Sequence, residues 1–379
     1  MKNVWITGDA LVTPLGFSSG ENFANLLQGK SGLKEIMSPV SGFSTWASFL
    51  SERQQKKLDE MTPPVFETRF EKLLFLPLKQ IIEEGNIDPR SSKTLFIFAS
   101  TKGNIELIGN ENVKPEQLSL YVSVLKISRY FGNPNKPIMI SNACISGLVV
   151  QITAMKLLEN GEYDTILIAG ADTVNPFILE GFNSLLALSP EPCRPFDRDR
   201  QGINIGEGGA AIMLTTKKPE NGIQSLIEIK GGAITNDANH ISGPSRTGKE
   251  LAKAAELALN QSGIVSGDID FVSAHGTATL YNDEMEAKAL TISGLSEKPT
   301  HSLKGYFGHT LGAAGLIESI ICIHSIRNNV IIASKGFENA GTLDHINIVT
   351  ENQYQPLSTC IKTMAGFGGC NAAICYSKS

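Results

Sequence analysis

Three side chains able to act as nucleophiles or hydrogen-bond donors each follow a predicted strand: Cys144, His275 and His309. Strand ends are where sheet-based proteins usually build their sites. Cys144 lies in "NACISG", where one apolar run ends, another begins, and small residues permit a sharp turn. At such a junction the helix dipole and free amides lower a thiol pKa, which favours a thiolate nucleophile. A lone cysteine is nevertheless more often a buried, inert residue.

The two histidines lie in motifs that suit a polar pocket. His275 is followed by "GTAT", which adds two hydroxyls, although a hydrogen-bonded core histidine is the commoner outcome for such a residue alone. His309 precedes a predicted helix, whose dipole disfavours the imidazolium and keeps the ring neutral. A neutral imidazole can donate one hydrogen bond to a developing enolate or oxyanion. Lys304 would complete this cluster, although alone it would be an ordinary surface lysine.

Two further motifs add groups of the same kind. The turn "AGFGGCN" offers backbone N–H groups for an oxyanion hole; the alternative is a tight turn with Phe367 buried as a core plug. Asp283 and Glu286 resemble metal ligands, but no third ligand is spaced with them. We therefore expect them to cap a helix and to orient a lysine or histidine. Each motif is weak singly, and their joint occurrence favours an active site.

The elements that must position these residues alternate between strand and helix, which predicts an α/β fold. A strand over 137–141 leads through Cys144 into an apolar helix that Gly161 ends. Residues 164–172 form a continuous apolar run, typical of a strand buried on both faces. The other predicted strands are 3–8, 94–100, 210–215, 224–233, 268–274 and 299–303; the other helices are 20–29, 69–84, 247–262, 283–294 and 311–327; and a hairpin joins 360–369 to 371–377.

Two segments of the chain have similar sequence patterns, and we call this similarity the echo. "SGLVVQITAMKLL" (146–158) and "AGLIESIICIHSI" (314–326) both place a small residue and Gly-Leu at the start of an apolar helix, 168 residues apart. The echo favours two similar α/β halves that meet face to face, which we place at residues 1–218 and 219–379.

Composition narrows the class of protein. The 379 residues carry a net charge of −5, which argues against a dedicated nucleic-acid binder. The six cysteines include no CxxC pair and no zinc-like spacing. The N-terminus lacks a signal-peptide core, and the most apolar later segment carries Glu318 and His324, so no membrane span is expected. These features predict a cytoplasmic protein with reduced thiols and no metal.

The motifs resemble those of the elongating β-ketoacyl-acyl-carrier-protein synthases of the thiolase superfamily. The similarity covers nearly the whole chain, in family order. The matching stretches are "NACISG", "RPFDRDRQGINIGEGG", "DANHISGP", "AHGTATLYNDEMEAKAL", "LKGYFGHTLGAAG" and "GFGGCNAA". The resemblance implies a thiolase-like fold, with duplicated βαβαβαββ halves in a five-layered α-β-α-β-α arrangement.

The resemblance also implies roles for individual residues. Cys144 would take an acyl chain from a carrier protein as a thioester. His275 and His309 would stabilise the enolate that forms when malonyl-carrier protein loses carbon dioxide, and this carbanion would attack the thioester. The backbone amides of Cys144 and Phe367 would form the oxyanion hole, with the Phe367 side chain as a gate. Lys304 and Glu286 would support the histidines, and the pantetheine arm would contact Thr277 and Thr279.

The cofactor and partners implied are those of a carrier-dependent enzyme. Phosphopantetheine arrives on the acyl carrier protein, with no cofactor of the enzyme's own. The expected assembly is a homodimer, with a heterodimer containing a related subunit as the alternative. For the acidic carrier we suggest a basic docking site formed by Arg69, Lys72 and Arg194.

Two departures from the family pattern limit what the resemblance implies. The segment 101–135 is trimmed, which leaves the acyl chain length and the pathway, fatty acid or polyketide and polyene, undetermined. Cys370 stands where a threonine is usual, and we interpret it as a small residue that fits the turn. The competing functions are a non-catalytic chain-length-factor-like partner, which typically lacks the cysteine, and a cysteine hydrolase.

Overall fold

The two halves of the chain repeat one order of elements, βαβαβαββ. The computed structural model describes residues 2–218 and 226–379. The first half consists of β1 (Val4–Val12), α3 (Arg69–Glu84), β4 (Thr94–Ala99), α4 (Leu120–Tyr130), β5 (Ile138–Ile140), α5 (Ser146–Asn160), β6 (Thr165–Asp172) and β8 (Gly208–Thr215). The second consists of β9 (Ile227–Asn236), α7 (Lys249–Ser262), β10 (Phe271–Ser273), α8 (Leu280–Ile292), β11 (Thr300–His301), α10 (Ala314–Asn328), β14 (Thr359–Gly366) and β15 (Cys370–Lys378).

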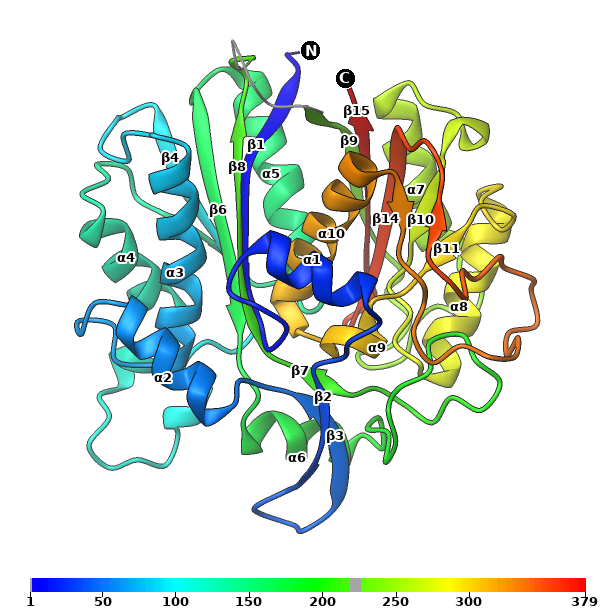
Figure 1. The fold of residues 1–379 in the computed structure, drawn as a ribbon, viewed down its shortest axis with the longest axis horizontal. Coiled ribbons are helices and arrows are strands. Elements are labelled where there is room, and N and C mark those ends of the chain that lie inside the picture. Colours follow the sequence, from blue (N-terminus) through cyan, green and yellow to red (C-terminus); the bar gives the residue numbers. More distant parts are fainter. Residues whose placement is uncertain (1, 219–225) are drawn as a thin grey trace.

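The strands form one sheet made of two equivalent parts. Its order is β11-β10-β14-β15-β9-β1-β8-β6-β4-β5, so each half contributes five adjacent strands in matching positions. The two half-sheets are joined where Val4–Ile6 of β1 pairs antiparallel with Ile227–Ile229 of β9. The predicted pair of sheets is therefore continuous at this short contact, and its two halves lie on either side of α5 and α10 (Figure 1).

The helices complete five layers. α3 packs on β1, β6 and β8 on one outer face, and α7 packs on β9, β14 and β15 on the other. Between the half-sheets, α5 and α10 contact each other and strands of both halves (Figure 1). Both central helices are buried at most of their positions, as helices covered by a sheet on each side must be. This arrangement confirms the predicted thiolase-like, five-layered fold.

The two echoed segments meet at the centre of the molecule. A Cβ added to Gly147 would lie 2.6 Å from the backbone nitrogen of Leu316, and one added to Gly315 would lie 2.6 Å from that of Leu148. Glycine at both positions lets the two helices approach closely. The repeated Gly-Leu pair is therefore the contact between the central helices.

We expect Gly147→Ala to lower the free energy of unfolding by about 2 kcal/mol or more, because the new methyl would overlap fixed backbone. The matched control is Gly20→Ala in α1 (Ser19–Leu27), where a Cβ meets nothing within 4 Å. Urea denaturation of the two variants measures the difference. Equal stabilities would show that α5 and α10 are not packed this closely.

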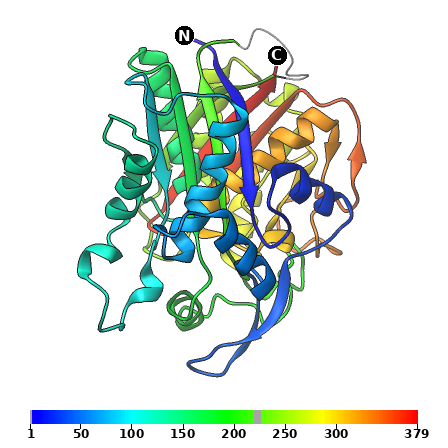
Figure 2. The ribbon, with the colours of Figure 1, turned by 60° about the vertical axis from the view of Figure 1, so that its left-hand side comes forward.

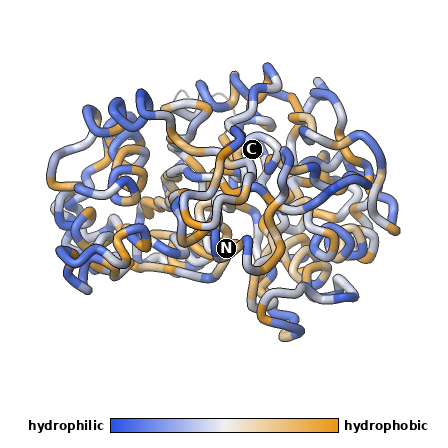
Figure 3. The backbone as a smooth tube through the Cα atoms, turned by 90° about the horizontal axis from the view of Figure 1, so that it is seen from below, coloured by the Kyte–Doolittle hydropathy of each residue, from blue (hydrophilic) through white to orange (hydrophobic). Residues whose placement is uncertain are grey.

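Several shorter elements were not predicted from the sequence. They include the hairpin of β2 (Leu33–Met37) and β3 (Ser44–Ser48), which projects from the body (Figure 2). Other helices and strands that were not predicted are α2 (Glu52–Met61), α4, α6 (Pro176–Ser184), β7 (Ile205–Gly206), α9 (Lys304–Phe307), β12 (Val330–Ile331) and β13 (Gln353–Tyr354). Polar segments gather along the outline of the molecule and apolar ones run through its interior (Figure 3).

The boundary between halves stays a prediction at 218/219. The crossing segment expected over 217–222 lies mostly outside the described residues. Within the described ranges, no helix is long and apolar enough to cross a membrane.

Candidate active site

The turn that presents Cys144 is tightly held. Ala143 has a φ of 43°, in the left-handed region that residues other than glycine rarely adopt. The Ser146 hydroxyl accepts a hydrogen bond from the Asn142 amide at 2.7 Å and donates one to the Ala143 carbonyl at 2.7 Å. α5 begins at Ser146. The strand-to-helix junction predicted around Cys144 is therefore present, and its sharpness comes from the strained residue before the cysteine.

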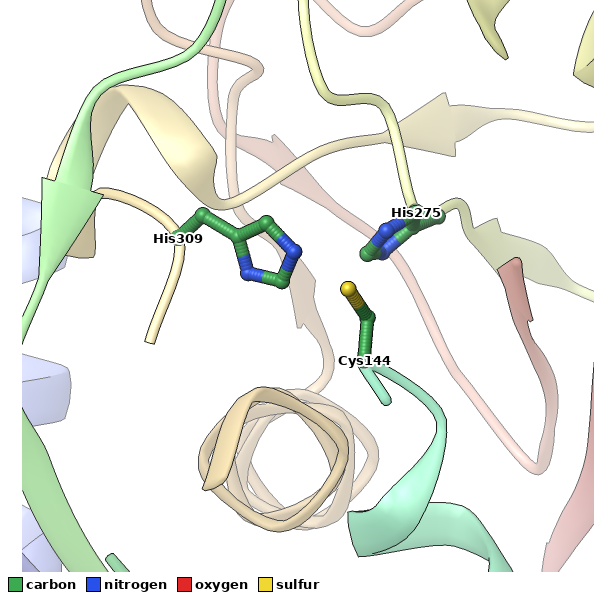
Figure 4. A group of neighbouring side chains, drawn as sticks. All are labelled: Cys144, His275 and His309. Atoms are coloured by element: carbon green, nitrogen blue, oxygen red, sulfur yellow. The ribbon is translucent and has the colours of Figure 1, made fainter. Parts of the chain in front are cut away.

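Cys144, His275 and His309 converge from three separate elements (Figure 4). The cysteine sulfur and one ring nitrogen of each histidine all lie within 4.8 Å of one another. The two rings are nearly perpendicular, with an interplanar angle of 82° and centroids 5.0 Å apart. Both histidines are almost fully buried, and Cys144 is 9% exposed. The structure thus brings together the three side chains singled out in the sequence.

The hydrogen bonds of the two histidines indicate which ring nitrogen carries the proton. His309 Nδ1 accepts from the Leu311 amide at 3.2 Å, so the proton of the neutral ring is on Nε2. His309 Nε2 has no hydrogen-bond partner among the described residues. His275 Nδ1 lies 3.4 Å from Lys304 Nζ, which leaves its Nε2 as the free donor. Each ring can therefore offer one N–H.

Both imidazoles are neutral at neutral pH. Burial, followed by the positive charge of Lys304, holds the pKa of His275 and of His309 well below the usual value. His309 is neutral, as expected. The cause is burial and the nearby Lys304, in place of the helix dipole on which the expectation was based. Two neutral N–H donors in a dry site suit a substrate oxygen that gains negative charge during a reaction.

The pKa expected for Cys144 is corrected by the structure. Burial raises the pKa of the thiol to about 12; the neighbouring Cys370 acts in the same direction, and Lys304 opposes it. Because the desolvation of a thiolate outweighs the favourable helix end, the resting residue is a thiol. Acyl transfer from another thioester needs no net proton acceptor, because the departing thiolate can take the proton that Cys144 loses.

Lys304 and Glu286 hold the segment around His275 from opposite sides. Lys304, fully buried rather than a surface lysine, donates to the His275 carbonyl at 3.1 Å and to Glu318. Glu286 accepts from the amides of His275 at 2.6 Å and Gly276 at 2.7 Å. Burial raises the pKa of Glu286, and these amides oppose the rise. Both residues thus contact the backbone of His275, and their supporting role stays a prediction.

Contrary to the expectation, Asp283 does not cap α8 or contact a lysine or histidine, but among the described residues it holds two backbone segments together. Its carboxylate accepts from the amides of Phe196 at 2.7 Å and Thr277 at 3.0 Å. Burial raises the pKa of Asp283 to about 7. Asp283 therefore fixes the "HGTAT" segment to the polar tract at 194–209.

The glycine turn approaches the nucleophile closely. A Cβ on Gly366 would lie 3.1 Å from the Cys144 nitrogen. The Phe367 backbone hydrogen-bonds to the Cys144 sulfur and acts to lower its pKa. The Phe367 side chain is 40% exposed and stacks on Phe182 with ring centroids 5.8 Å apart, so it is not a core plug. The backbone of this turn therefore lies next to Cys144, and the roles of Phe367 in an oxyanion hole and as a gate stay predictions.

A cavity of about 470 Å³ opens onto these groups. Thr277 and Thr279 line it, and their hydroxyls lie 2.8 Å apart. The loop around His240, expected to be an active-site loop, lines it too. The remaining contacts include apolar side chains at the mouth, where Leu186 is 91% exposed. A long, thin substrate arm would reach Cys144 through this opening.

The polar tract at 194–209 is a scaffold for the site. The His309 amide donates to the Asn204 carbonyl at 2.7 Å. Buried Glu207 accepts from the amides of Leu50 at 2.8 Å and Val174 at 3.0 Å. Arg200, also buried, contacts Asp283 at 3.8 Å. Although its charge pattern alone would suggest a solvated loop, this tract is therefore largely inside the protein.

The three residues suggested for carrier docking are engaged in ion pairs. Arg69 contacts Glu106 at 3.2 Å and Glu207 at 3.5 Å. Lys72 contacts Asp59 at 2.6 Å, and Arg194 approaches Glu338 at 4.0 Å. None of the three lines the cavity. Their role in docking stays a prediction.

Cys144, His275 and His309 are also close enough to share a metal ion. The surrounding charge does not fit that use, because Lys304 is buried beside the rings and Lys362 acts on both of them. A cation placed among the three would face two ammonium groups. The donor set fits an anionic or developing-anionic substrate better.

Two family models match most of the chain. Residues 1–220 match the β-ketoacyl synthase N-terminal domain, and residues 226–338 match the β-ketoacyl synthase C-terminal domain. The chain belongs to the β-ketoacyl synthase family. It is similar to the 3-oxoacyl-[acyl-carrier-protein] synthase 2 of Vibrio cholerae, with 26% identity over 426 residues that cover 100% of this chain and 99% of the relative.

Solved structures share the fold over the whole chain. A ketosynthase in complex with its chain length factor from Xenorhabdus doucetiae has a TM-score of 0.88 and 25% identity, covering 100% of this chain and 98% of that one. A type II polyketide synthase carrier protein in complex with its ketosynthase has a TM-score of 0.84 and 23% identity, covering 100% of both. The second likeness bears on the fold alone.

Sequence reasoning missed three buried groups near the site: Glu318, Lys362 and Asp172. Asp172 accepts from the Gly312 amide at 2.8 Å and from the Ser100 hydroxyl at 2.9 Å, and burial raises its pKa to about 6. A charged residue within an apolar strand or helix was the available signal for all three.

Proposed function

We propose that this protein is a decarboxylating condensing enzyme, which joins malonyl-acyl-carrier protein to an acyl group held on Cys144 and releases a 3-oxoacyl-acyl-carrier protein. The observation that carries the proposal is the convergence of one thiol and two neutral imidazole donors at the end of a cavity. Covalent capture of the acyl group splits a difficult carbon–carbon bond formation into acyl transfer and condensation.

The first step is a thioester exchange. The Cys144 sulfur attacks the acyl carbon of an acyl-carrier protein, the pantetheine sulfur leaves, and the proton of the Cys144 thiol passes to it. The tetrahedral intermediate carries its negative charge on the former carbonyl oxygen. The backbone amides of Cys144 and Phe367 are the donors we assign to that oxygen.

The second step uses the histidines. The malonyl thioester loses carbon dioxide, and its electrons pass to the thioester oxygen, which His275 Nε2–H and His309 Nε2–H stabilise. The resulting carbanion attacks the acyl carbon on Cys144, the carbon–sulfur bond breaks, and the departing Cys144 thiolate takes a proton from solvent. Thr277 and Thr279 hold the pantetheine arm, and Lys304 and Glu286 keep the histidines in place.

The partners follow from this chemistry. The acyl and malonyl groups arrive on the phosphopantetheine of an acyl carrier protein, and the enzyme needs no cofactor of its own. We place the protein in the cytoplasm, in fatty acid or related polyketide and polyene elongation, as a dimer of two copies. Pairing with a related ketosynthase-like subunit is the alternative, which native mass spectrometry distinguishes by mass.

Incubation with an acyl-carrier protein, with and without malonyl-carrier protein, tests the proposal against a cysteine hydrolase. Condensation gives a 3-oxoacyl product only when the malonyl form is present, whereas a hydrolase releases free acid in both reactions. A non-catalytic partner subunit would do neither. The complete set of Cys144, His275, Lys304 and His309 favours the active enzyme over that alternative.

Charge reversal at the predicted docking residues should weaken carrier binding. The variants are Lys72→Glu, Arg194→Glu and Arg69→Gln. We expect each of them to raise the Kd for the carrier protein about fivefold at low salt. This is the equivalent of about 1 kcal/mol, the value of one surface ion pair. The dependence of Kd on salt should fall as well. Lys217→Glu, at the opposite end of the sheet from Cys144, is the control. Unchanged binding in all three variants would place docking elsewhere.

A further inference from the structure

A second buried lysine lies beneath the active site. Lys362 is on β14, and its side chain is 0% exposed. Its Nζ contacts Glu318 Oε2 at 2.7 Å and donates to three carbonyls: Ser273 at 3.2 Å, Ala274 at 3.1 Å and Thr363 at 3.0 Å. A buried ammonium is costly unless its donors are satisfied, and here every donor has an acceptor. The mechanism above assigns this residue no role.

The contacts of Lys362 lead directly to His275. Ser273 and Ala274 are the two residues before that histidine, and their carbonyls accept from Lys362. The next carbonyl, that of His275 itself, accepts from Lys304 at 3.1 Å. Three successive carbonyls thus face two ammonium groups. On the other side, the amides of His275 and Gly276 donate to Glu286.

Glu318 connects the two lysines. One of its oxygens contacts Lys304 and the other contacts Lys362. Burial alone would raise the pKa of Glu318, but the two lysines together bring it below its usual value. Lys304 is in turn the neighbour of His275 Nδ1. Moving Lys362 would therefore displace Glu318, and through it Lys304.

Charge as well as position links Lys362 to the histidines. It acts on the pKa of His275 and of His309 in the same direction as Lys304, downward. The other groups around it are Glu318 on α10, Lys304 on α9, Glu286 on α8 and Cys360 on its own strand. With both carboxylates ionised, the two lysines and two glutamates balance, so loss of Lys362 leaves the histidines in a net negative surrounding.

We propose that Lys362 is a positioning residue of the active site, which holds the strand end before His275, orients Lys304 through Glu318, and supplies a second buried positive charge beside both histidines. The catalytic part of this assignment rests on the proposed function, because the neutral state of the imidazoles affects the reaction only if they act as hydrogen-bond donors. The contacts themselves are independent of which substrate is used.

The test is a pH titration of the histidine rings in the Lys362→Gln and Lys362→Met variants. NMR of protein labelled with ¹⁵N-histidine monitors this titration. Signals are assigned with His275→Gln and His309→Gln. Removing the positive charge should raise the titration midpoint of at least one ring by on the order of half a pH unit or more. Glutamine retains donors for the carbonyls, so it separates the effect of charge from that of hydrogen bonding. Lys253→Met, which loses only the surface pair with Glu256 on α7, is the control.

The pH profile of malonyl decarboxylation supplies the catalytic readout. Because the neutral ring is the active form, its acidic limb should move to higher pH in Lys362→Gln by the same amount as the titration. A purely structural role would lower the rate without moving the limb. Midpoints that match the wild type in both variants would overturn the assignment, as would failure of both variants to fold. A wild-type protein without decarboxylation would refute the proposed function, while the titration would still decide the role of Lys362.

Discussion

Cys144→Ala should abolish condensation, with a fall in rate of at least about 10⁴-fold, because the variant lacks the atom that carries the acyl group. The cavity and both histidines remain, so malonyl decarboxylation should persist at a measurable rate. Mass spectrometry of the 3-oxoacyl-carrier protein measures condensation. Release of carbon dioxide measures decarboxylation separately. The expected result is loss of the first with retention of the second.

The matched control is Cys375→Ala, which removes a buried thiol from β15 that has no place in the site. It should condense at close to the wild-type rate. Condensation that survives in Cys144→Ala would show that the acyl group is carried elsewhere. Cys370, whose thiol donates to the Phe367 carbonyl at 3.2 Å, would then be the first residue to test.

His309→Ala should lose decarboxylation while Cys144 can still be acylated. The His309 ring provides an N–H with no partner among the described residues, and it lies beside Cys144 and His275 (Figure 4). Loss of one such donor costs about 10²–10³-fold in other enzymes. Acylation depends instead on the thiol and on the backbone amides, which the substitution does not remove. Carbon dioxide release and intact-protein mass spectrometry report the two steps.

The control for this prediction is His345→Ala, which truncates an exposed histidine outside the cavity. A His309→Ala variant that decarboxylates at the wild-type rate would remove His309 from the mechanism. A variant that can no longer be acylated would place the residue in the first step instead of the second.

Much of the fold was predictable because its central elements have strong, regular patterns. The helix expected at 69–84 has the same bounds in the structure, and the Gly-Leu echo marked the helices that touch through Gly147 and Gly315. The continuity of the sheet was not predictable, since it rests on three pairs between strands more than 200 residues apart. Strand β10 covers only Phe271–Ser273 of the predicted 268–274, because a 3-10 helix at Ser266–Asp268 precedes it.

Several elements missed from the sequence bury few residues. α2 buries a single residue, Leu58, in an otherwise polar segment, so few apolar positions mark it. The hairpin of β2 and β3 is exposed along much of β2. α4 lies in the trimmed segment 101–135, where Tyr121 and Val122 remain exposed. Neighbouring parts of the chain, and not local pattern, define these elements.

For the site, residue type and spacing identified the reacting groups, but they did not indicate the burial and the neighbouring charges that set the pKa of each group. Cys144, His275, Lys304 and His309 were found because each sits at a strand or helix end. The high pKa of Cys144 was missed, because burial is a property of the folded protein and outweighs the local helix end. Lys362 was missed because a lysine in an otherwise apolar strand finds its partner, Glu318, on another element.

The central claim is that Cys144 carries the acyl group and passes it to a malonyl-derived carbanion. Intact-protein and peptide mass spectrometry after incubation with acyl-carrier proteins of varied chain length tests it directly. We predict one acyl mass on the peptide containing Cys144, which disappears when malonyl-carrier protein is added as the 3-oxoacyl product forms. An acyl group found on another residue, or released as free acid without condensation, would contradict the account.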